Sequence, residues 1–406
     1  MKILTVVFLS LCSLVFNDVA GQPSQYIVSL KDKNNNPFSI NHPEAYLSAK
    51  SIDRRKKQGI SIDSTDLPVS PTYLDSLLNT GAISIINTSR WLNQVLIQTN
   101  DPDVLQTISH FSFVHTLKQV SPRHASHKRK EIEKLIISPT AQQRRFQIQD
   151  KEDKYDYGNM YDQIKIHEGN FLHNKGFRGE GMTIAIIDAG FYHYNTNPAF
   201  DSVRLNNQIL GTWDFVKNGS DVTEEHYHGM VCFSTIAANR PGVLVGSAPK
   251  ANFYLFRTEN VADEYPTEEQ NWVVAAEKAD SLGVDLISSS LGYYTFSNHA
   301  YDHTYQDMDG ETTIITRGAE LAAKKGIFVC NSAGNAAQES WHYIAAPADG
   351  KHVLAVAAVN AEKEVAPFSS YGPSYDGRIK PDVASVGWGT VIADNSGNPA
   401  SANGTS

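Results

Sequence analysis

Short apolar runs alternate with helical patterns over the C-terminal part of the chain, and this alternation constrains the fold more than any other feature. The runs are continuously apolar, which fits strands buried on both faces. Between them, residues 267–282 and 313–325 place apolar side chains at helical spacing. A repeated strand, helix, strand order predicts a parallel sheet with helices on both sides. The expected strands are 183–187, 252–256, 284–289, 327–331 and 353–357.

The preceding residues follow a different pattern. From about residue 22 to residue 120, short strand and helix patterns are mixed, which predicts a small α+β unit. The expected strands are 26–30, 83–86, 91–97 and 113–117, and the expected helices are 43–57, 73–78 and 103–108. From 121 to 155 the periodicity stops and basic residues gather; these are Arg123, His124, His127, Lys128, Arg129, Lys130, Arg144 and Arg145. A plain solvated linker and an exposed site of proteolytic maturation both fit this basic linker.

Residues 1–21 have the order of a secretory signal peptide. Lys2 precedes an apolar run over residues 3–16, and the small pair Ala20-Gly21 follows. The run is about 14 residues long, shorter than the ~20 that a helix needs to span a bilayer. An uncleaved membrane anchor is the alternative. We therefore expect an exported protein, extracellular or periplasmic, without a membrane span once the signal is removed.

The composition excludes several classes of protein. Hydrophobic residues make up 41% of the chain, too many for a disordered protein, and three cysteines cannot form a disulfide scaffold. The formal net charge of −9 gives no electrostatic footprint for nucleic acid. Beyond the signal, Cys232 and Cys330 lie in apolar stretches, where two buried thiols are favoured over a bridge.

Polar residues follow several of the predicted strands. Asp188 comes directly after the first strand, Asn335 follows the fourth, and His228 precedes an apolar helical run over residues 230–238. Ligands of parallel sheets bind at the carboxyl ends of the strands, so these residues are candidates for a site. With Ser406, the chain order Asp, His, Ser is one of the few orders known for serine triads. Asn335 could donate an amide hydrogen bond to an oxyanion.

Together these segments resemble the subtilases, the subtilisin-like serine proteases. The resemblance runs continuously from Tyr157 to Ser406, and residues 22–120 are similar to the amino-terminal prodomains of a secreted bacterial subgroup. The matching segments are 186–190 (IIDAG), 228–230 (HGM), 290–292 (SLG), 332–335 (SAGN), 368–373 (FSSYGP), 380–383 (KPDV) and 404–406 (GTS). The resemblance implies an α/β, subtilisin-like three-layer fold with a mostly parallel sheet, preceded by a small α+β prodomain.

The resemblance also implies a role for each site residue. Ser406 would attack the scissile carbonyl, His228 would take its proton, and Asp188 would orient the imidazole. The Asn335 side chain and the Ser406 backbone N–H would bind the oxyanion. The family strand that pairs with an extended peptide substrate corresponds to Ser290, Leu291 and Gly292.

The function implied is that of a secreted serine endopeptidase made as a precursor. Its partners would be a polypeptide substrate and its own prodomain, which would act as an intramolecular inhibitor and assist the slow folding of a parallel sheet. The expected division is a signal at 1–21, the prodomain at 22–120, the basic linker at 121–155 and a catalytic domain at 156–406. A noncatalytic peptide-binding or chaperone-like protein on the same scaffold is the alternative. An esterase would need a Gly-x-Ser-x-Gly elbow, which the chain lacks.

Two further expectations concern the end of the chain and metals. In subtilases the nucleophile opens a long buried helix, so a catalytic domain ending at Ser406 is expected to be C-terminally incomplete and poorly active, whereas the full reading frame would encode an active protease. No cofactor is predicted. The segment 307–311 (DMDGE) offers oxygen ligands of the kind calcium prefers, but it lacks the spacing of a full calcium loop, which favours an acidic surface turn.

Overall fold

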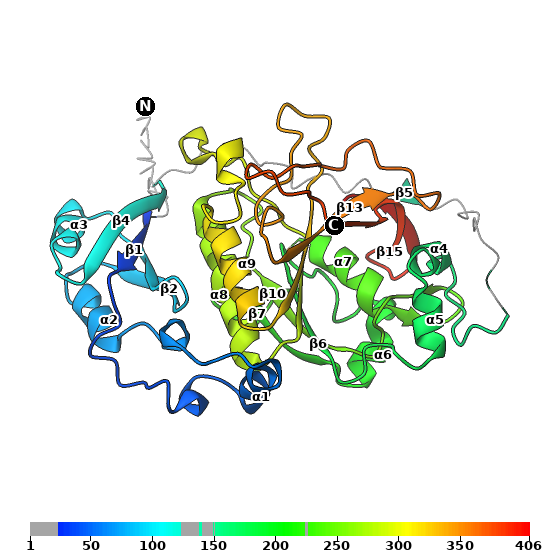
Figure 1. Ribbon diagram of the computed structural model, residues 1–406, viewed down its shortest axis with the longest axis horizontal. Coiled ribbons are helices and arrows are strands. Elements are labelled where there is room, and N and C mark those ends of the chain that lie inside the picture. The colour runs from blue at the N-terminus through cyan, green and yellow to red at the C-terminus, as the bar shows by residue number, and fades with distance from the viewer. Residues whose placement is uncertain (1–22, 123–137, 140–148, 150, 224–225) are drawn as a thin grey trace, which may run out of the picture.

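A seven-stranded sheet of parallel strands forms the centre of the C-terminal part of the molecule (Figure 1). The computed structural model describes residues 23–122, 138–139, 149, 151–223 and 226–406. The predicted signal segment and the basic clusters at 123–130 and 144–145 of the predicted linker lie outside the described residues. In sheet order the strands are β14 (Val383–Val386), β13 (Val353–Val359), β12 (Phe328–Ser332), β11 (Leu286–Ser289), β6 (Thr183–Asp188), β10 (Asn252–Arg257) and β7 (Ile209–Asp214).

The five predicted strands are confirmed as β6, β10, β11, β12 and β13, which lie next to one another in the sheet. The sequence patterns missed β7 and β14, the two edge strands. Most of their residues are half-exposed or exposed, because an edge strand has a neighbour on one side only. They therefore lack the continuous apolar run by which the inner strands were predicted.

Helices cover both faces of the sheet, as predicted. The helices of this part of the chain are α4 (Tyr161–Lys165), α5 (Gly169–Asn174), α6 (Asp201–Leu205), α7 (His228–Ala237), α8 (Pro266–Leu282) and α9 (Ile314–Lys324). On β6, Ala185 and Ile187 pack into a core cluster with α8 and α9, whereas Ile184 and Ile186 pack into a second cluster with α7. This is the three-layer α/β fold that the sequence predicts. None of the helices in the described residues combines the length and apolar content needed to cross a bilayer.

A small antiparallel sheet directly precedes the last three residues of the sequence. It consists of β15 (Trp388–Ala393), β16 (Pro399–Asn403) and β5 (Ser138–Pro139). β15 contacts α7, where the Ala393 N–H donates to the Ser234 hydroxyl at 2.9 Å. β5 belongs to the predicted linker, so two described residues of that stretch pair with the C-terminal part of the chain. Two short strands, β8 (Asn239–Arg240) and β9 (Leu244–Val245), form a separate pair.

The N-terminal region, residues 23–122, is a four-stranded antiparallel sheet with helices. Its strands lie in the order β2 (Ser84–Ser89), β3 (Gln94–Gln98), β1 (Gln25–Leu30) and β4 (Val114–Ser121), and its helices are α1 (Ala49–Gln58), α2 (Pro71–Leu78) and α3 (Pro102–Ser109). The predicted helix over 43–57 is two elements, because Ser48 caps the start of α1 by accepting a hydrogen bond from the Ser51 N–H. A short 3-10 turn at Pro43–Ala45 precedes it. The predicted strand over 91–97 begins only at Gln94, after a turn in which Asn93 has φ +52°.

The N-terminal region packs against α8 (Figure 1). Trp91, 5% exposed, shares a core cluster with Trp272 of α8, and Leu96 of β3 packs in a smaller cluster that Ile314 of α9 contacts. Apolar side chains from the two parts of the chain therefore form common cores.

A buried carboxylate on α8 joins the two parts electrostatically. Asp280 is fully buried and binds three guanidinium groups of the N-terminal region: Arg54, Arg55 at 2.8 Å and Arg90 at 2.7 Å. Glu277, one turn earlier, accepts hydrogen bonds from the hydroxyl of Ser89 and from two backbone N–H groups that follow it. Buried charges require such compensation, since an unpaired one costs several kcal/mol, roughly, to desolvate. We call Arg54, Arg55, Arg90, Glu277 and Asp280 the interface ion cluster.

Candidate active site

Asp188 and His228, which the sequence places at a strand end and a helix start, lie in direct contact. Asp188 is the last residue of β6, and His228 is the first residue of α7. The next residue allows this approach: a Cβ atom on Gly229 would lie 2.5 Å from the carbonyl oxygen of Gly190 and 2.8 Å from the Cβ of Asp188. Only glycine therefore fits where α7 meets the end of β6.

The pair is held by a short, buried hydrogen bond. His228 Nδ1 lies 2.7 Å from Asp188 Oδ1. The Ala189 N–H donates to the same oxygen at 2.7 Å. His228 is 4% exposed and Asp188 is 0% exposed. Burial by itself lowers the pKa of His228, but the negative charge of Asp188, together with the neighbouring Cys232, outweighs burial and holds this pKa well above the ordinary value. With Nδ1 bonded to Asp188, Nε2 is the ring nitrogen that can exchange a proton.

A cysteine lies beside the imidazole. Cys232 Sγ is 3.9 Å from His228 Nδ1 and 4.0 Å from Nε2. Cys232, His228 and Asp188 form the one group of three potential metal-ligand side chains in the described residues whose ligand atoms lie within 4.8 Å of one another. The spacing of four residues on a helix is the signal that could have predicted this contact. Cys232 and Cys330 are free thiols, as favoured from the sequence. Cys330 is only half-buried, but this burial raises the pKa of its thiol to about 11.

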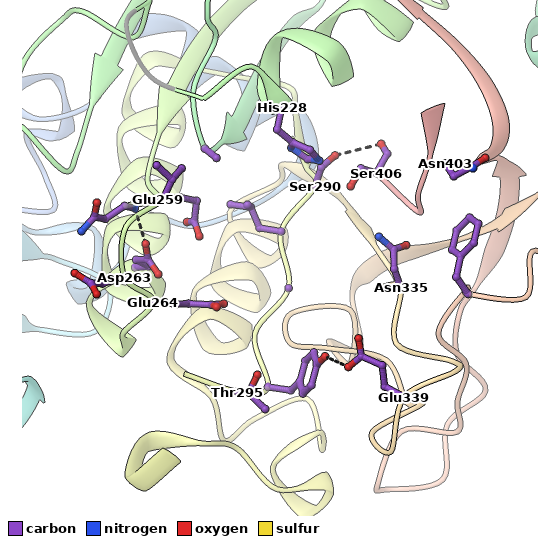
Figure 2. A pocket seen from close by; sticks show the side chains of 18 of the residues that line it. His228, Glu259, Asp263, Glu264, Ser290, Thr295, Asn335, Glu339, Asn403 and Ser406 are labelled. Carbon is purple, nitrogen blue, oxygen red and sulfur yellow. Dashed lines mark hydrogen bonds between the residues drawn. The ribbon is translucent and has the colours of Figure 1, made fainter. Parts of the chain in front are cut away.

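Asn335 is oriented by the residue before Ser406. Its Oδ1 accepts hydrogen bonds from the Thr405 N–H at 2.8 Å and from the Thr405 hydroxyl at 3.0 Å. The Gly334 N–H donates to the same hydroxyl at 3.0 Å. Because Oδ1 is held by Thr405, the amide nitrogen of Asn335 faces the side on which Ser406 lies (Figure 2).

One pocket gathers the predicted site residues. It has a volume of ≈ 690 Å³, and its lining includes His228, Ser290, Leu291, Gly292, Asn335 and Ser406. Figure 2 shows Ser406 beside Ser290, whose hydroxyl donates to the Ser406 carbonyl oxygen at 3.2 Å. Asp188 lies behind His228, away from solvent. The structure thus brings all the candidate residues to one place, at the carboxyl ends of the parallel strands.

The sequence analysis missed the acidic side of this pocket. The lining also includes Glu259, Asp263, Glu264, Glu268 and Glu339. The first four lie between the end of β10 and the first turn of α8. Their position after a strand of the parallel sheet is the signal that could have predicted them, since that edge carries the ligands of such folds.

The acidic segment 307–311 forms local turns. The Asp307 carboxylate accepts a hydrogen bond from the Thr304 N–H at 2.7 Å, and that of Asp309 accepts from the Glu311 and Thr312 N–H groups at 2.8 Å each. Such bonds within three residues are those of an acidic turn at the surface.

Comparison with protein families gives two adjacent matches. Residues 25–134 match the peptidase S8 propeptide domain of Bacteroidota, and residues 179–406, more than half of the chain, match the subtilase family. The first match contains the antiparallel sheet of the N-terminal region, and the second contains the parallel sheet together with the pocket.

Individual relatives agree with these matches. The chain is 30% identical over 226 residues to serine protease AprX of Bacillus subtilis (strain 168), covering 52% of this chain and 47% of the relative. It is 30% identical over 210 residues to subtilisin NAT of Bacillus subtilis subsp. natto, covering 50% and 48%. Thermitase of Thermoactinomyces vulgaris is 30% identical over 201 residues, covering 49% and 62%. The chain spans about half the length of AprX and subtilisin NAT.

One assignment accounts for the parallel α/β fold and for the propeptide match. It also accounts for the match to the family model over the residues that line the pocket. The chain belongs to the subtilase family of serine peptidases.

Proposed function

We propose that this protein is a secreted serine endopeptidase in which Asp188, His228 and Ser406 form the catalytic triad. The observation that carries the proposal is the buried 2.7 Å bond between Asp188 and His228, whose ring lines the same pocket as Ser406. A carboxylate that bonds to Nδ1 of an imidazole and leaves Nε2 available in a pocket with a serine is the arrangement that general-base catalysis requires. Membership of the subtilase family supports the same chemistry.

The proposed first chemical step uses these three groups. Ser406 Oγ attacks the carbonyl carbon of the scissile peptide bond while its proton passes to His228 Nε2. Asp188 stabilises the imidazolium that forms, because its carboxylate bonds to Nδ1. The imidazolium then gives the proton to the leaving amine, and water completes hydrolysis of the acyl-enzyme by the reverse sequence.

Asn335 and the Ser406 backbone N–H stabilise the negative charge on the carbonyl oxygen. The two bonds from Thr405 to Asn335 Oδ1 support this role, because they hold the amide in one orientation before substrate arrives. A preorganised donor of this kind is worth about 2.7–4 kcal/mol of transition-state stabilisation in subtilisin, the system in which it was measured.

Ser290, Leu291 and Gly292 bind the backbone of an extended substrate. Main-chain hydrogen bonds along such a segment supply affinity, and side pockets select the side chains of the peptide. All three residues line the pocket that contains His228 and Ser406.

The proposed precursor consists of a signal peptide at 1–21, a prodomain at 22–120, a basic linker at 121–155 and a catalytic domain at 156–406. The interface ion cluster and the shared apolar cores support a prodomain that stabilises and inhibits the catalytic domain. The signal peptide directs the protein out of the cytoplasm, to the extracellular space or the periplasm.

A fluorophosphonate probe tests the nucleophile. In the product of the full reading frame that contains this chain, the probe should label the wild type, and Ser406→Ala should remove all labelling because the phosphonylated oxygen is lost. Ser396→Ala, at an exposed turn outside the pocket, serves as the control and should keep full labelling. Labelling that persists in folded Ser406→Ala rejects Ser406 as nucleophile, and binding of peptides without any labelling favours the noncatalytic alternative.

The pH dependence tests the His228–Asp188 pair. For an uncharged peptide, kcat/KM should fall as the pH is lowered through the pKa of His228, because the protonated imidazole cannot act as a base. Asp188 raises this pKa, so the midpoint of the acid limb should lie above pH 6.5. A pH–rate profile measures the midpoint, with tryptophan fluorescence at each pH confirming that the protein stays folded. A midpoint at or below 6.5 contradicts the stabilisation of the imidazolium by Asp188.

A further inference from the structure

The segment Ser290–Gly292, to which we assign the backbone of the substrate, lies between β11 and the next helical turn and is held by its neighbours. The Asn331 side-chain nitrogen donates to the Leu291 carbonyl oxygen at 2.9 Å. Directly after the segment, the Tyr293 N–H donates to the Ala346 carbonyl oxygen at 2.9 Å, and the Ala346 N–H donates back at 3.2 Å. These bonds fix the backbone at the middle of the segment and just beyond its end.

The Tyr293 side chain adds a contact to the acidic side of the pocket. Its hydroxyl donates to Oε1 of Glu259, which lines the pocket (Figure 2). The Thr258 hydroxyl donates to the same oxygen at 2.9 Å. Tyr293 is 1% exposed and Glu259 is 7% exposed. The bond between them therefore favours one arrangement of the two side chains, because breaking it would leave a buried polar group without a partner.

This hydrogen bond spans the edge of the sheet at which the candidate site lies. Glu259 follows β10 and Tyr293 follows β11, and these two strands flank β6, which ends in Asp188. The bond therefore joins the chain on the two sides of the strand that carries Asp188. Loss of the bond would free the segment Ser290–Gly292 to move while Asp188 and His228 stay bonded to each other.

Glu259 makes this contact without adding a full charge to the site at neutral pH. Burial, reinforced by the charge of Glu264, raises the pKa of Glu259 to about 8. The charge of Asp188 acts in the same direction, whereas the hydroxyl bonds from Tyr293 and Thr258 lower this pKa. At neutral pH the side chain is therefore mostly a neutral acid, which still accepts both bonds. Burial also raises the pKa of Tyr293 well above its ordinary value, so its hydroxyl remains a donor.

We propose that Tyr293 and Glu259 are positioning residues for substrate binding, whose hydrogen bond holds Ser290–Gly292 in the arrangement that an extended peptide requires. Neither residue is assigned a contact with the reacting atoms, and both act through the segment. A segment that is ordered in advance loses less conformational entropy when the peptide binds, so the bond strengthens the binding of long substrates. This inference rests on the proposed function, because it concerns substrate binding at the same site.

Tyr293→Phe tests the proposal by removing the hydroxyl alone. In the mature protein from the full reading frame, KM for a long quenched peptide should rise about 10-fold or more, because binding must then order the segment. The value of kcat should change by less than about 3-fold, since the triad is untouched. The rate of labelling by a small fluorophosphonate should also stay within about 3-fold of the wild-type rate, because this probe reaches Ser406 without binding along Ser290–Gly292.

Tyr305→Phe is the matched control. The Tyr305 hydroxyl also donates to a single oxygen, the Pro373 carbonyl oxygen at 3.0 Å, but the residue lies outside the pocket. This substitution should leave KM unchanged. An unchanged KM in folded Tyr293→Phe overturns the proposal. So does a labelling rate that falls as far as kcat/KM, because the substitution would then disturb Ser406 itself.

Two substitutions of Glu259 separate positioning from filling of space. Glu259→Gln keeps an uncharged acceptor oxygen, so KM at neutral pH should stay within about 3-fold of the wild-type value. Glu259→Leu keeps a side chain of similar size without an acceptor, so KM should rise as in Tyr293→Phe. The double variant Tyr293→Phe/Glu259→Leu should be no weaker than either single variant, because all three lack the same bond. Effects on KM that multiply in the double variant, or equal effects of Glu259→Gln and Glu259→Leu, contradict the positioning role.

A binding measurement keeps this inference distinct from the proposed function. If the wild type cleaves no peptide, fluorescence anisotropy gives the Kd of the intact peptide for the wild type and for Tyr293→Phe. A Kd that is about 10-fold higher for the variant upholds the positioning role although the protease proposal fails. Cleavage with the same KM by both proteins upholds the protease proposal and rejects the positioning role.

Discussion

Replacing His228 with alanine should lower kcat for peptide hydrolysis about 10⁶-fold, the size of the effect found when the histidine of the subtilisin triad is removed. The loss is expected because the imidazole bonded to Asp188 is the base that we propose for Ser406. The measurement compares kcat of wild type and variant, both expressed from the full reading frame, on a quenched peptide. Fluorophosphonate labelling should decline in parallel, since Ser406 loses its base.

A second histidine provides a matched control for this substitution. His352 also bonds to a carboxylate, with Nδ1 2.7 Å from Glu320 Oε2, but its side chain is 53% exposed and it lies outside the pocket. His352→Ala should leave kcat unchanged. A folded His228→Ala protein that keeps more than a tenth of wild-type kcat would show that another group acts as the base.

Replacing Asp280 with asparagine should weaken the attachment of the N-terminal region by about 3–5 kcal/mol, because it leaves three buried guanidinium groups without their shared carboxylate. Urea unfolding of the full chain, in the Ser406→Ala background to prevent self-cleavage, measures the loss. Trp91 lies in the common core at this interface, so tryptophan fluorescence should report separation of the two parts.

An exposed ion pair at the same interface serves as the comparison. Lys50 Nζ lies 2.7 Å from Asp285 Oδ2, but its side chain is 43% exposed. Lys50→Met should therefore cost less than about 1 kcal/mol, as is usual for pairs screened by water. If the two substitutions lower the free energy of unfolding equally, burial does not determine how much the interface ion cluster contributes to that free energy.

The sheet could be predicted from the sequence wherever strands are buried on both sides. All six residues of β6 are buried, so their apolar run is unambiguous. β7 and β14 were not predictable in the same way, because edge strands keep polar and exposed residues. The division of the predicted helix over 43–57 depends on a cap at Ser48, a local hydrogen bond that apolar spacing does not reveal.

The candidate site was predictable in identity but not in its supporting contacts. Asp188 and His228 follow from strand order and motif, because both lie at the edge where parallel strands end. The bonds from Thr405 to Asn335 join residues 70 positions apart, and only the folded chain brings them together. The acidic side of the pocket was missed for a related reason: each of its carboxylates is ordinary alone, and only the folded chain places the β10–α8 loop in the same pocket as the segment Ser290–Gly292.

The interface ion cluster lies at one end of α8, and that position has a consequence for the mature protein. The backbone dipole of a helix places partial negative charge at its C-terminal end, where lysine and arginine are usually favourable. The last turn of α8 contains Asp280 and no basic residue, so the guanidinium groups of the N-terminal region supply the missing positive charge from outside the helix. The proposed removal of the N-terminal region would leave Glu277 and Asp280, which are buried in the precursor, solvated beside the helix end. The mature protein should then carry a new anionic patch, and this end of α8 should fray more readily in low salt than in the precursor.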